Sequence, residues 1–397
     1  MVKIKLMKIG MLSALCIIAF NFYADWAFAF YKEIWMKKCN DGIEKLQLID
    51  SNKNNIKEIL VLSGYKRLYL LGWDKHKGEI IEKWESSKFS DGIDIKYYDF
   101  NNFLLIQKYD LAVYYTLFLK NGEYALKEIK ESMIPSWKGE EYIRAGSFKK
   151  RGEKDIFLTS SSGTSPHKKY LNIRETRLPN KLLWTSTFQI QNVSVQLFGD
   201  FDNDKKIELL IIPYNDTKIY WISPKEDKFE GKEMDNSKRW LFPIRPSNPE
   251  KQLKAGRTAA KNFDELFFIY IPSYYGGPLY KAVWQKDRFE VEEILSTKGI
   301  MGYDNLNLAD MDNDGLDEII ISEIRGDLVE TEEEPFIKNH RDVIHIVKWN
   351  GKEYKKIWTS KPLGAITQIL VDDMTGDGKK EIVVGNAKGE LHIFGQK

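Results

Sequence analysis

Three stretches of the chain place oxygen-bearing side chains at positions 1, 3, 5 and 9 of a short segment. These residues are Asp200, Asp202, Asp204 and Glu208; Asp310, Asp312, Asp314 and Glu318; and Asp373, Thr375, Asp377 and Glu381. Side chains with this spacing in a tight turn can converge on one hard cation. Calcium takes roughly six to eight oxygen ligands, with carbonyls and waters completing the set. The spacing therefore predicts three calcium sites, and an Asx-rich turn without metal is the alternative for each.

An EF-hand is the other familiar calcium loop, and the sequence argues against it. An EF-hand needs a bidentate Glu at position 12 and a helix on each side. Position 12 of these segments is Ile211, Ile321 or Val384. The residues after position 9 are aliphatic, largely β-branched runs of strand length, which favour a strand over a helix.

Weaker copies of the loop occur elsewhere in the chain. The copy with residues Asp50, Asn52, Asn54 and Glu58 is complete, with amides in place of two carboxylates. A shortened copy begins at Asp99. Two copies, beginning at Ser147 and Arg257, have lost the ligands, and their Lys or Arg side chains can supply a tethered positive charge instead. The loops thus begin at 50, 99, 147, 200, 257, 310 and 373, which predicts an array of seven repeated units.

Each unit is expected to contribute four strands, and four-stranded units of this length stacked around an axis are β-propeller blades. The sequence therefore predicts an all-β, seven-bladed β-propeller over residues 30–397. The last unit has three strands of its own, Ala365–Val371, Lys380–Gly385 and Leu391–Phe394. Tyr31–Met36 is predicted to supply its outer strand, so that the N-terminal strand closes the ring in a 3+1 arrangement and hides sheet edges. An open β-solenoid is the alternative.

The loops resemble those of the FG-GAP/VCBS repeat family, the seven-bladed propellers typified by the integrin α-subunit head. The segment Phe198-Gly199-Asp200-Phe201-Asp202-Asn203-Asp204 matches the family loop closely. The loop headed by Asp310 also has the family's Gly at position 6, which is Gly315. Lys205 stands at that position after Asp204, and we expect it to strain the turn. The resemblance covers roughly residues 30–397.

The first 29 residues have the pattern of a secretory signal. Three lysines precede the apolar run Ile9–Phe20, and Ala27-Phe28-Ala29 supplies a small-x-small cleavage site. An uncleaved anchor is the alternative, because Ile9–Phe30 carries only Asp25 as a charged residue and the basic residues lie on the inner side. Either interpretation predicts export, to the medium, the periplasm or the cell surface.

The composition limits the classes of partner that the chain is expected to bind. Removing residues 1–29 takes away three Lys and one Asp, so that 60 basic and 58 acidic residues become 57 of each. A chain without net charge has no overall field to attract nucleic acid, so no nucleic-acid partner is expected. Membrane contact is expected only through an uncleaved anchor. Cys39 is the single cysteine of the mature chain, which excludes an intrachain disulfide.

The predicted partner surface lies away from the calcium loops. In an up-and-down blade, the turns between strands 1 and 2 share one face with the 3-to-4 hairpins, and the 2-to-3 turns lie on the opposite face. The longest insertions, Ser160–Lys169, Pro272–Tyr280 and Ile324–Asp342, fall on that second face, and such loops on a rigid scaffold often carry recognition. Candidate residues for a protein or glycan ligand are His167, Lys168, Tyr274, Tyr275, Arg325 and His340.

The sequence contains no familiar catalytic motif. Gly-x-Ser-x-Gly, the P-loop, His-Glu-x-x-His and Cys-x-x-Cys are all missing, and His345 and His392 fall within predicted strands, where packing explains them. The leading hypothesis is an exported, non-enzymatic propeller with structural calcium, used for adhesion or protein interaction. The alternative is a carbohydrate-binding propeller or a polysaccharide lyase, in which Lys, Arg or His near calcium would abstract a proton.

Overall fold

The computed structural model describes the chain from Tyr31 to Gln396. Excepted are residues 40, 51–55, 65, 90–92, 98–103, 109–113, 121–122, 130–139, 150–155, 166–167, 176–180, 192, 214–217, 226–227, 236–251, 261, 271–275, 287, 298–300, 330 and 332–335. The predicted signal or anchor and the candidate residues Asn52, Asn54, His167, Tyr274 and Tyr275 lie outside the described residues. Among those described, no helix has the length and apolar character needed to cross a membrane.

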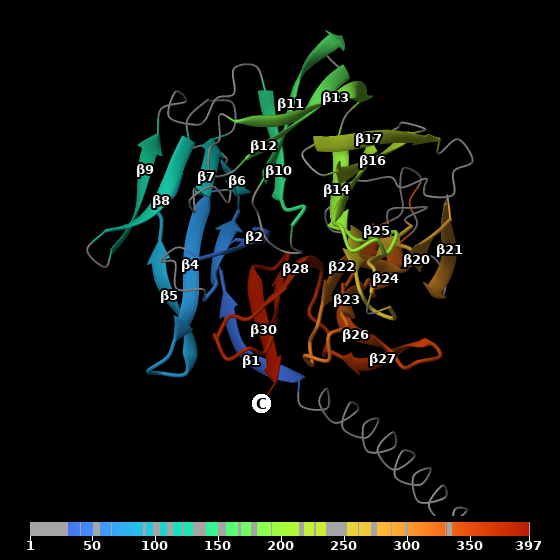
Figure 1. The fold of residues 1–397 in the computed structure, drawn as a ribbon. Helices are drawn as coiled ribbons and strands as arrows, with labels where there is room; N and C mark the ends of the chain where they lie inside the picture. The colour runs from blue at the N-terminus through green and yellow to red at the C-terminus, as the bar shows by residue number, and fades with distance from the viewer. Residues whose placement is uncertain are drawn as a thin grey trace, which may run out of the picture.

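The described residues form seven four-stranded antiparallel sheets, which confirms the all-β class (Figure 1). The first three sheets contain β2 (Ile43–Ile49), β3 (Glu58–Ser63), β4 (Arg67–Asp74) and β5 (Glu79–Glu85); β6 (Ile93–Tyr97), β7 (Leu104–Lys108), β8 (Tyr114–Lys120) and β9 (Glu123–Ile129); and β10 (Glu140–Gly146), β11 (Ile156–Ser165), β12 (Lys168–Glu175) and β13 (Leu182–Gln191).

The next three sheets contain β14 (Val193–Gly199), β15 (Glu208–Pro213), β16 (Lys218–Lys225) and β17 (Lys228–Asp235); β18 (Leu253–Gly256), β19 (Glu265–Ile269), β20 (Leu279–Gln285) and β21 (Arg288–Leu295); and β22 (Tyr303–Ala309), β23 (Glu318–Glu323), β26 (Val343–Trp349) and β27 (Tyr354–Thr359). The last sheet contains β28 (Ile366–Asp372), β29 (Glu381–Asn386), β30 (Glu390–Gln396) and β1 (Tyr31–Lys38). A separate hairpin pairs β24 (Asp327–Val329) with β25 (Phe336–Lys338).

The last sheet is built from both ends of the described chain. β1 pairs antiparallel with β30, with Tyr31 opposite Gln396, and takes the outer position that the sequence assigns to Tyr31–Met36. The Tyr31 hydroxyl donates to the Lys380 carbonyl at 2.6 Å, and Trp358 Nε1 of the preceding sheet donates to the Tyr31 carbonyl at 3.1 Å. These bonds fix the N-terminal strand against two sheets at once.

The first strands of successive sheets lie beside one another. β6 contacts β2, β2 contacts β28, and the series continues through β22, β18 and β14 to β10. Polar side chains join neighbouring inner strands: the Gln368 amide accepts from the Leu46 N–H at 2.7 Å and donates to the Leu46 carbonyl at 3.1 Å. The apolar core lies between sheets, as in the cluster that Met311, Ile346 and Ile382 share.

Burial along the strands follows from this packing. Each residue of the second strands β3, β19 and β29 is buried, because neighbouring sheets cover both faces of these strands. Such strands are nearly continuous aliphatic runs, as expected for strands without a solvent face. The outer strands β21 and β27 are half exposed, and Lys and Glu alternate with their apolar residues.

Two of the predicted insertions are more regular than the sequence indicated. β11 runs on to Ser165 and β12 begins at Lys168, so most of Ser160–Lys169 lengthens a hairpin and is not an irregular loop. Backbone hydrogen bonds hold this extension, and they do not require apolar side chains. The insertion Ile324–Asp342 contains the β24–β25 hairpin.

Candidate metal centre

The three acidic loops share one backbone form. In each, positions 4 and 6 adopt the left-handed conformation. These residues are Asn203 (φ 65°) and Lys205 (φ 68°), Asn313 (φ 59°) and Gly315 (φ 87°), and Gly376 (φ 75°) and Gly378 (φ 83°). Asn and Gly tolerate this region, whereas a Lys side chain pays a steric cost there. The expected strain at Lys205 is therefore present.

The Glu at position 9 fastens each loop to the start of the second strand. The N–H of the residue at position 2 donates to this carboxylate: Phe201 to Glu208 at 3.0 Å, Met311 to Glu318 at 2.8 Å and Met374 to Glu381 at 2.7 Å. These Glu side chains are buried, as are the apolar residues at position 2. The arrangement delivers one buried carboxylate to the inner side of every loop.

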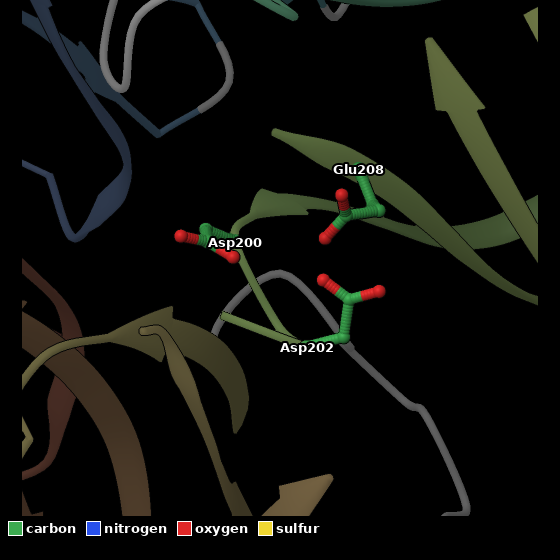
Figure 2. Close-up of side chains that lie close together, drawn as sticks. All are labelled: Asp200, Asp202 and Glu208. Atoms are coloured by element: carbon green, nitrogen blue, oxygen red, sulfur yellow. The ribbon is translucent and has the colours of Figure 1, made fainter. Parts of the chain in front are cut away.

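In the Asp200 loop, three carboxylates converge. Oxygen atoms of Asp200, Asp202 and Glu208 all lie within 4.8 Å of one another. Figure 2 shows the Asp202 and Glu208 carboxylates facing each other with Asp200 beside them. Asp200 is only 3% exposed, and its Oδ1 is buried with no hydrogen-bond partner in the described part of the chain. The structure does not bring Asp204 into this group; its side chain is exposed and pairs with Lys206 at 3.2 Å.

The electrostatics of this loop show a shortage of positive charge. Burial raises the pKa of Glu208 to about 8, and the nearby Asp202, Asp204 and Asp200 charges add to the shift. Burial likewise raises the pKa of Asp200, with Asp202 and Asp204 contributing. A hard divalent cation would satisfy the unpartnered oxygen and relieve the repulsion, so the donor set fits calcium.

The Asp310 loop has the same convergence but a different neighbour. Oxygen atoms of Asp310, Asp312 and Glu318 lie within 4.8 Å of one another. Lys348 of β26 reaches the loop: its Nζ is 2.9 Å from both Asp314 Oδ2 and Glu318 Oε1, and it also pairs with Asp312.

The Lys348 ammonium stays charged in this position. Burial alone lowers the pKa of Lys348, but hydrogen bonds and charges of Asp312, Glu318 and Asp314 outweigh that effect and raise it. A cation from the chain itself therefore lies among the carboxylates that the sequence assigned to calcium.

The predicted loops headed by Asp373 and Asp50 have other hydrogen-bond and ion-pair partners. Asp373 accepts backbone N–H bonds from Gly376 at 2.6 Å, Asp377 at 3.2 Å and Gly378 at 2.8 Å, and Thr375 donates to it at 3.5 Å. Burial raises the pKa of Glu381 to about 7, with Asp377 and Asp373 adding to it. In the Asp50 loop, the Lys83 ammonium lies 3.0 Å from Glu58 Oε1.

Consecutive loops are joined through reciprocal backbone contacts. The Asp200 N–H donates to Asp264 Oδ2 at 2.8 Å, and the Asp264 N–H donates to the Asp200 carbonyl at 2.6 Å. Arg257 and Asp317 repeat the exchange at 2.9 and 2.6 Å. Arg257 Nε also lies 3.4 Å from Asp264 Oδ1, so a cation is present in a loop that has lost its acidic ligands.

Two of the candidate partner residues meet in the Ile324–Asp342 insertion. The Arg325 N–H donates to Asp342 Oδ1 at 3.1 Å, and His340 Nδ1 lies 3.2 Å from the same oxygen. The Arg325 guanidinium binds Glu323 at 3.0 and 3.1 Å, while its side chain stays 45% exposed. Lys168 lies apart from them, at the start of β12.

The strand histidines are engaged within their sheets. His345 is buried, with Nε2 2.6 Å from Glu323 Oε2 and Nδ1 2.8 Å from Thr359 Oγ1. His392 Nδ1 lies 2.5 Å from Glu33 Oε1, which joins β30 to β1. Packing and these bonds account for His345, whereas His392 Nε2 is buried without a hydrogen-bond partner among the described residues and lies 3.7 Å from Glu390 Oε2.

Sequence reasoning missed Lys348, although a signal existed in the strand register. Ile319 pairs with Val347, so the next pair along the ladder places Lys348 opposite Glu318. The long insertion between β23 and β26 separates these two residues by 30 positions in the sequence, which conceals their pairing. Aligning the third strands of the sheets by their C-terminal ends would have revealed that Lys348 lies opposite Glu318.

No family model matches the chain, and no curated protein matches it in sequence. Among solved structures, the chain is similar to BBS1N in complex with ARL6DN, with TM-scores of 0.52 and 0.51 in crystals soaked with lead and with mercury. The identity is 8%, and the alignment covers 93% of this chain and 97% of that chain. Saccharomyces cerevisiae Sqt1 gives a TM-score of 0.46 at 10% identity, over 92% of this chain and 97% of that chain.

The fold is a β-propeller. At 8% identity the likeness to BBS1N concerns the fold alone.

Proposed function

We propose that the chain is an exported, calcium-binding β-propeller that works as a non-enzymatic binding or adhesion module, in which calcium is structural. The observation that carries the calcium proposal is the Asp200 loop. Three carboxylates converge there, and a buried Asp200 oxygen has no partner in the described part of the chain. The Asp373 loop, whose Glu381 has a raised pKa, is the second proposed site.

The proposed architecture is a closed ring of seven blades like that of the FG-GAP/VCBS family. The seven described sheets, the β1–β30 pairing and the shared loop conformation support it. The inner strands adjoin in a series from β6 to β10, and closure would bring the β6 and β10 sheets together. Closure would leave no inner sheet edge open to another chain.

Calcium would stabilise the loops by a modest amount per site. Extracellular modules bind calcium with dissociation constants of about 10⁻⁴–10⁻³ M. At about 1 mM free ion, a site with a constant of about 10⁻⁴ M contributes roughly 1.4 kcal/mol. Two such sites would supply roughly 3 kcal/mol, compared with about 5–15 kcal/mol for the whole stability of an ordinary domain.

The proposed ligand is a protein or a glycan on the face that carries the β24–β25 hairpin. This hairpin projects from the 2-to-3 connection of its sheet, and Arg325 and His340 lie at its base. Phe336 of β25 is 42% exposed and Lys338 lies over its ring, which gives this strand of the hairpin an apolar and basic surface.

A calcium titration tests the metal proposal. The melting temperature of the exported protein should rise when calcium replaces a chelator, and Asp200→Ala should reduce the rise by about half. Glu353→Ala removes an exposed carboxylate from the turn before β27 and should leave the rise unchanged. Equal melting temperatures with calcium and with chelator would overturn the proposal.

Binding assays test the rest of the proposal. A glycan array with and without calcium, followed by incubation with uronic-acid polymers, separates the alternatives. Calcium-independent glycan binding would favour a carbohydrate-binding propeller. Release of unsaturated products from the polymers would show a lyase and overturn the non-enzymatic assignment.

A further inference from the structure

We propose that Lys348 is a tethered cation that takes the place of a divalent ion in the Asp310 loop. The inference rests on the proposed calcium binding at the Asp200 loop. Three carboxylates converge in both the Asp200 loop and the Asp310 loop, but only the Asp200 loop would need metal. Lys348 would then give the Asp310 loop a counter-charge that does not depend on the calcium concentration.

The geometry of Lys348 fits this role. Its ammonium contacts Asp312, Asp314 and Glu318, and an ammonium has three donors to offer. Its side chain is only 16% exposed, so the charge is withdrawn from water and satisfied by these acids. Because β26 places Lys348 directly opposite Glu318, the ladder itself holds the side chain over the loop.

The equivalent positions in two other sheets carry no charge. The register of β15 with β16 places Ser223 opposite Glu208, and the Ser223 hydroxyl accepts a hydrogen bond from Trp221 Nε1 at 2.9 Å. The register of β29 with β30 places Gly395 opposite Glu381, and a Cβ on Gly395 would lie 3.4 Å from Glu381 Cγ. This position therefore adjoins the buried Glu, and a lysine there can reach it.

Lysines of two further sheets reach the same Glu from other positions. The Lys83 ammonium of β5 lies 3.0 Å from Glu58 Oε1. The Lys83 side chain passes over Gly72, where an added Cβ would lie 2.4 Å from Lys83 Cε. Lys281 of β20 lies 3.5 Å from Glu265. A lysine thus reaches this Glu from three different strands, which shows that the chain can itself supply a cation to the buried carboxylate.

The ammonium and calcium exclude each other. Calcium would bind the same oxygens at about 2.3–2.6 Å, which would place it in contact with an ammonium that is 2.9 Å from two of them. Two cations at that separation in a buried site repel strongly. Calcium would therefore have to displace Lys348 into solvent and could not add to it.

A reciprocal exchange tests the inference. Lys348→Ser gives the Asp310 loop the residue found opposite Glu208, and Ser223→Lys gives the Asp200 loop the residue found opposite Glu318. Calcium per chain is measured by equilibrium dialysis and calorimetry, with each protein purified in calcium. Lys348→Ser should bind one more calcium than the wild type, and Ser223→Lys should bind one fewer. Lys352→Ser removes an exposed lysine near the same strand and should match the wild type.

The outcomes separate this inference from the proposed function. If the wild type binds calcium but neither exchange alters the number bound, Lys348 does not substitute for an ion and the inference fails alone. If the wild type binds none and Lys348→Ser gains one, the inference stands and the proposed calcium site at Asp200 fails. Calcium binding by none of the variants overturns both. Should Lys348→Ser not fold, an unchanged number in folded Ser223→Lys would still overturn the inference.

Discussion

The loops headed by Asp200 and Asp310 carry the same acids at positions 1, 3, 5 and 9, yet different residues approach them from the third strand. Ser223 stands opposite Glu208, whereas Lys348 stands opposite Glu318 and pairs with three of the acids of its loop. Each loop keeps a buried oxygen without a hydrogen-bond partner among the described residues, Asp200 Oδ1 in the first loop and Asp312 Oδ1 in the second, so the lysine is what differs. A loop sequence thus defines where oxygens gather, while a residue from another strand decides whether an ammonium group lies among them.

Removing the lysine should give the largest effect. Lys348→Met keeps a long side chain but leaves Asp312, Asp314 and Glu318 without their counter-charge. Breaking a buried ion pair on one side costs about 3–5 kcal/mol, so urea unfolding in chelator should show a loss of about 3 kcal/mol. Lys352→Met is the exposed control. A loss no greater than that of the control would mean that the Asp310 loop does not need the ammonium.

The pH dependence should give the next largest effect, and all three loops should contribute to it. Burial raises the pKa of Glu208 and of Glu318 to about 8 and that of Glu381 to about 7, from an ordinary value of 4.5. The folded chain therefore holds protons that the unfolded chain has already lost, and stability in chelator should fall as pH rises from about 5 to about 8. The proposed calcium would bind the ionised carboxylates, so its affinity should increase several-fold over the upper part of that range.

Unfolding curves and calcium titrations between pH 5.5 and 8.5 measure both trends. Glu208→Gln cannot ionise and should flatten the fall in stability measured in chelator. A stability that rises with pH in chelator would contradict the raised pKa values of these carboxyl groups.

The backbone of the two loops should give the smallest effect. Lys205 and Gly315 occupy position 6 with φ of 68° and 87°. Glycine has no steric penalty there, so Lys205→Gly should raise stability by about 1 kcal/mol, and Gly315→Lys should lower it by about as much. Nothing lies within 4 Å of a Cβ added at Gly315, so the loss would come from the backbone and not from a clash. Thermal unfolding of both variants in chelator checks this, and changes of the same sign would contradict the strain argument.

Much of the fold was predictable because its signals are local. The runs after position 9 pointed to strands, and β23 and β29 begin at Glu318 and Glu381, within a residue of the expected starts. The strand-length segment Tyr31–Met36 had no unit of its own, and it pairs with β30. The Ser-rich extension of β11 was not predictable, because its pairing with β12 depends on backbone bonds and not on an apolar pattern.

The site was predictable only in its acidic part. Asp200, Asp202 and Glu208 converge as their spacing suggested, whereas Asp204 turns to Lys206. An acidic side chain at the exposed tip of a turn can turn away from the other carboxylates and pair with a neighbouring lysine, because the two arrangements differ little in free energy. Spacing alone therefore does not fix its direction.

The repeating strands, the loop positions and the acidic residues that gather in the loops follow from the sequence alone, because backbone preferences and hydrophobic runs act over a few neighbouring residues. Only the tertiary structure decided which loops already hold a charge. That choice depends on antiparallel register, which brings Lys348 to Glu318 across a long insertion and leaves Ser223 facing Glu208.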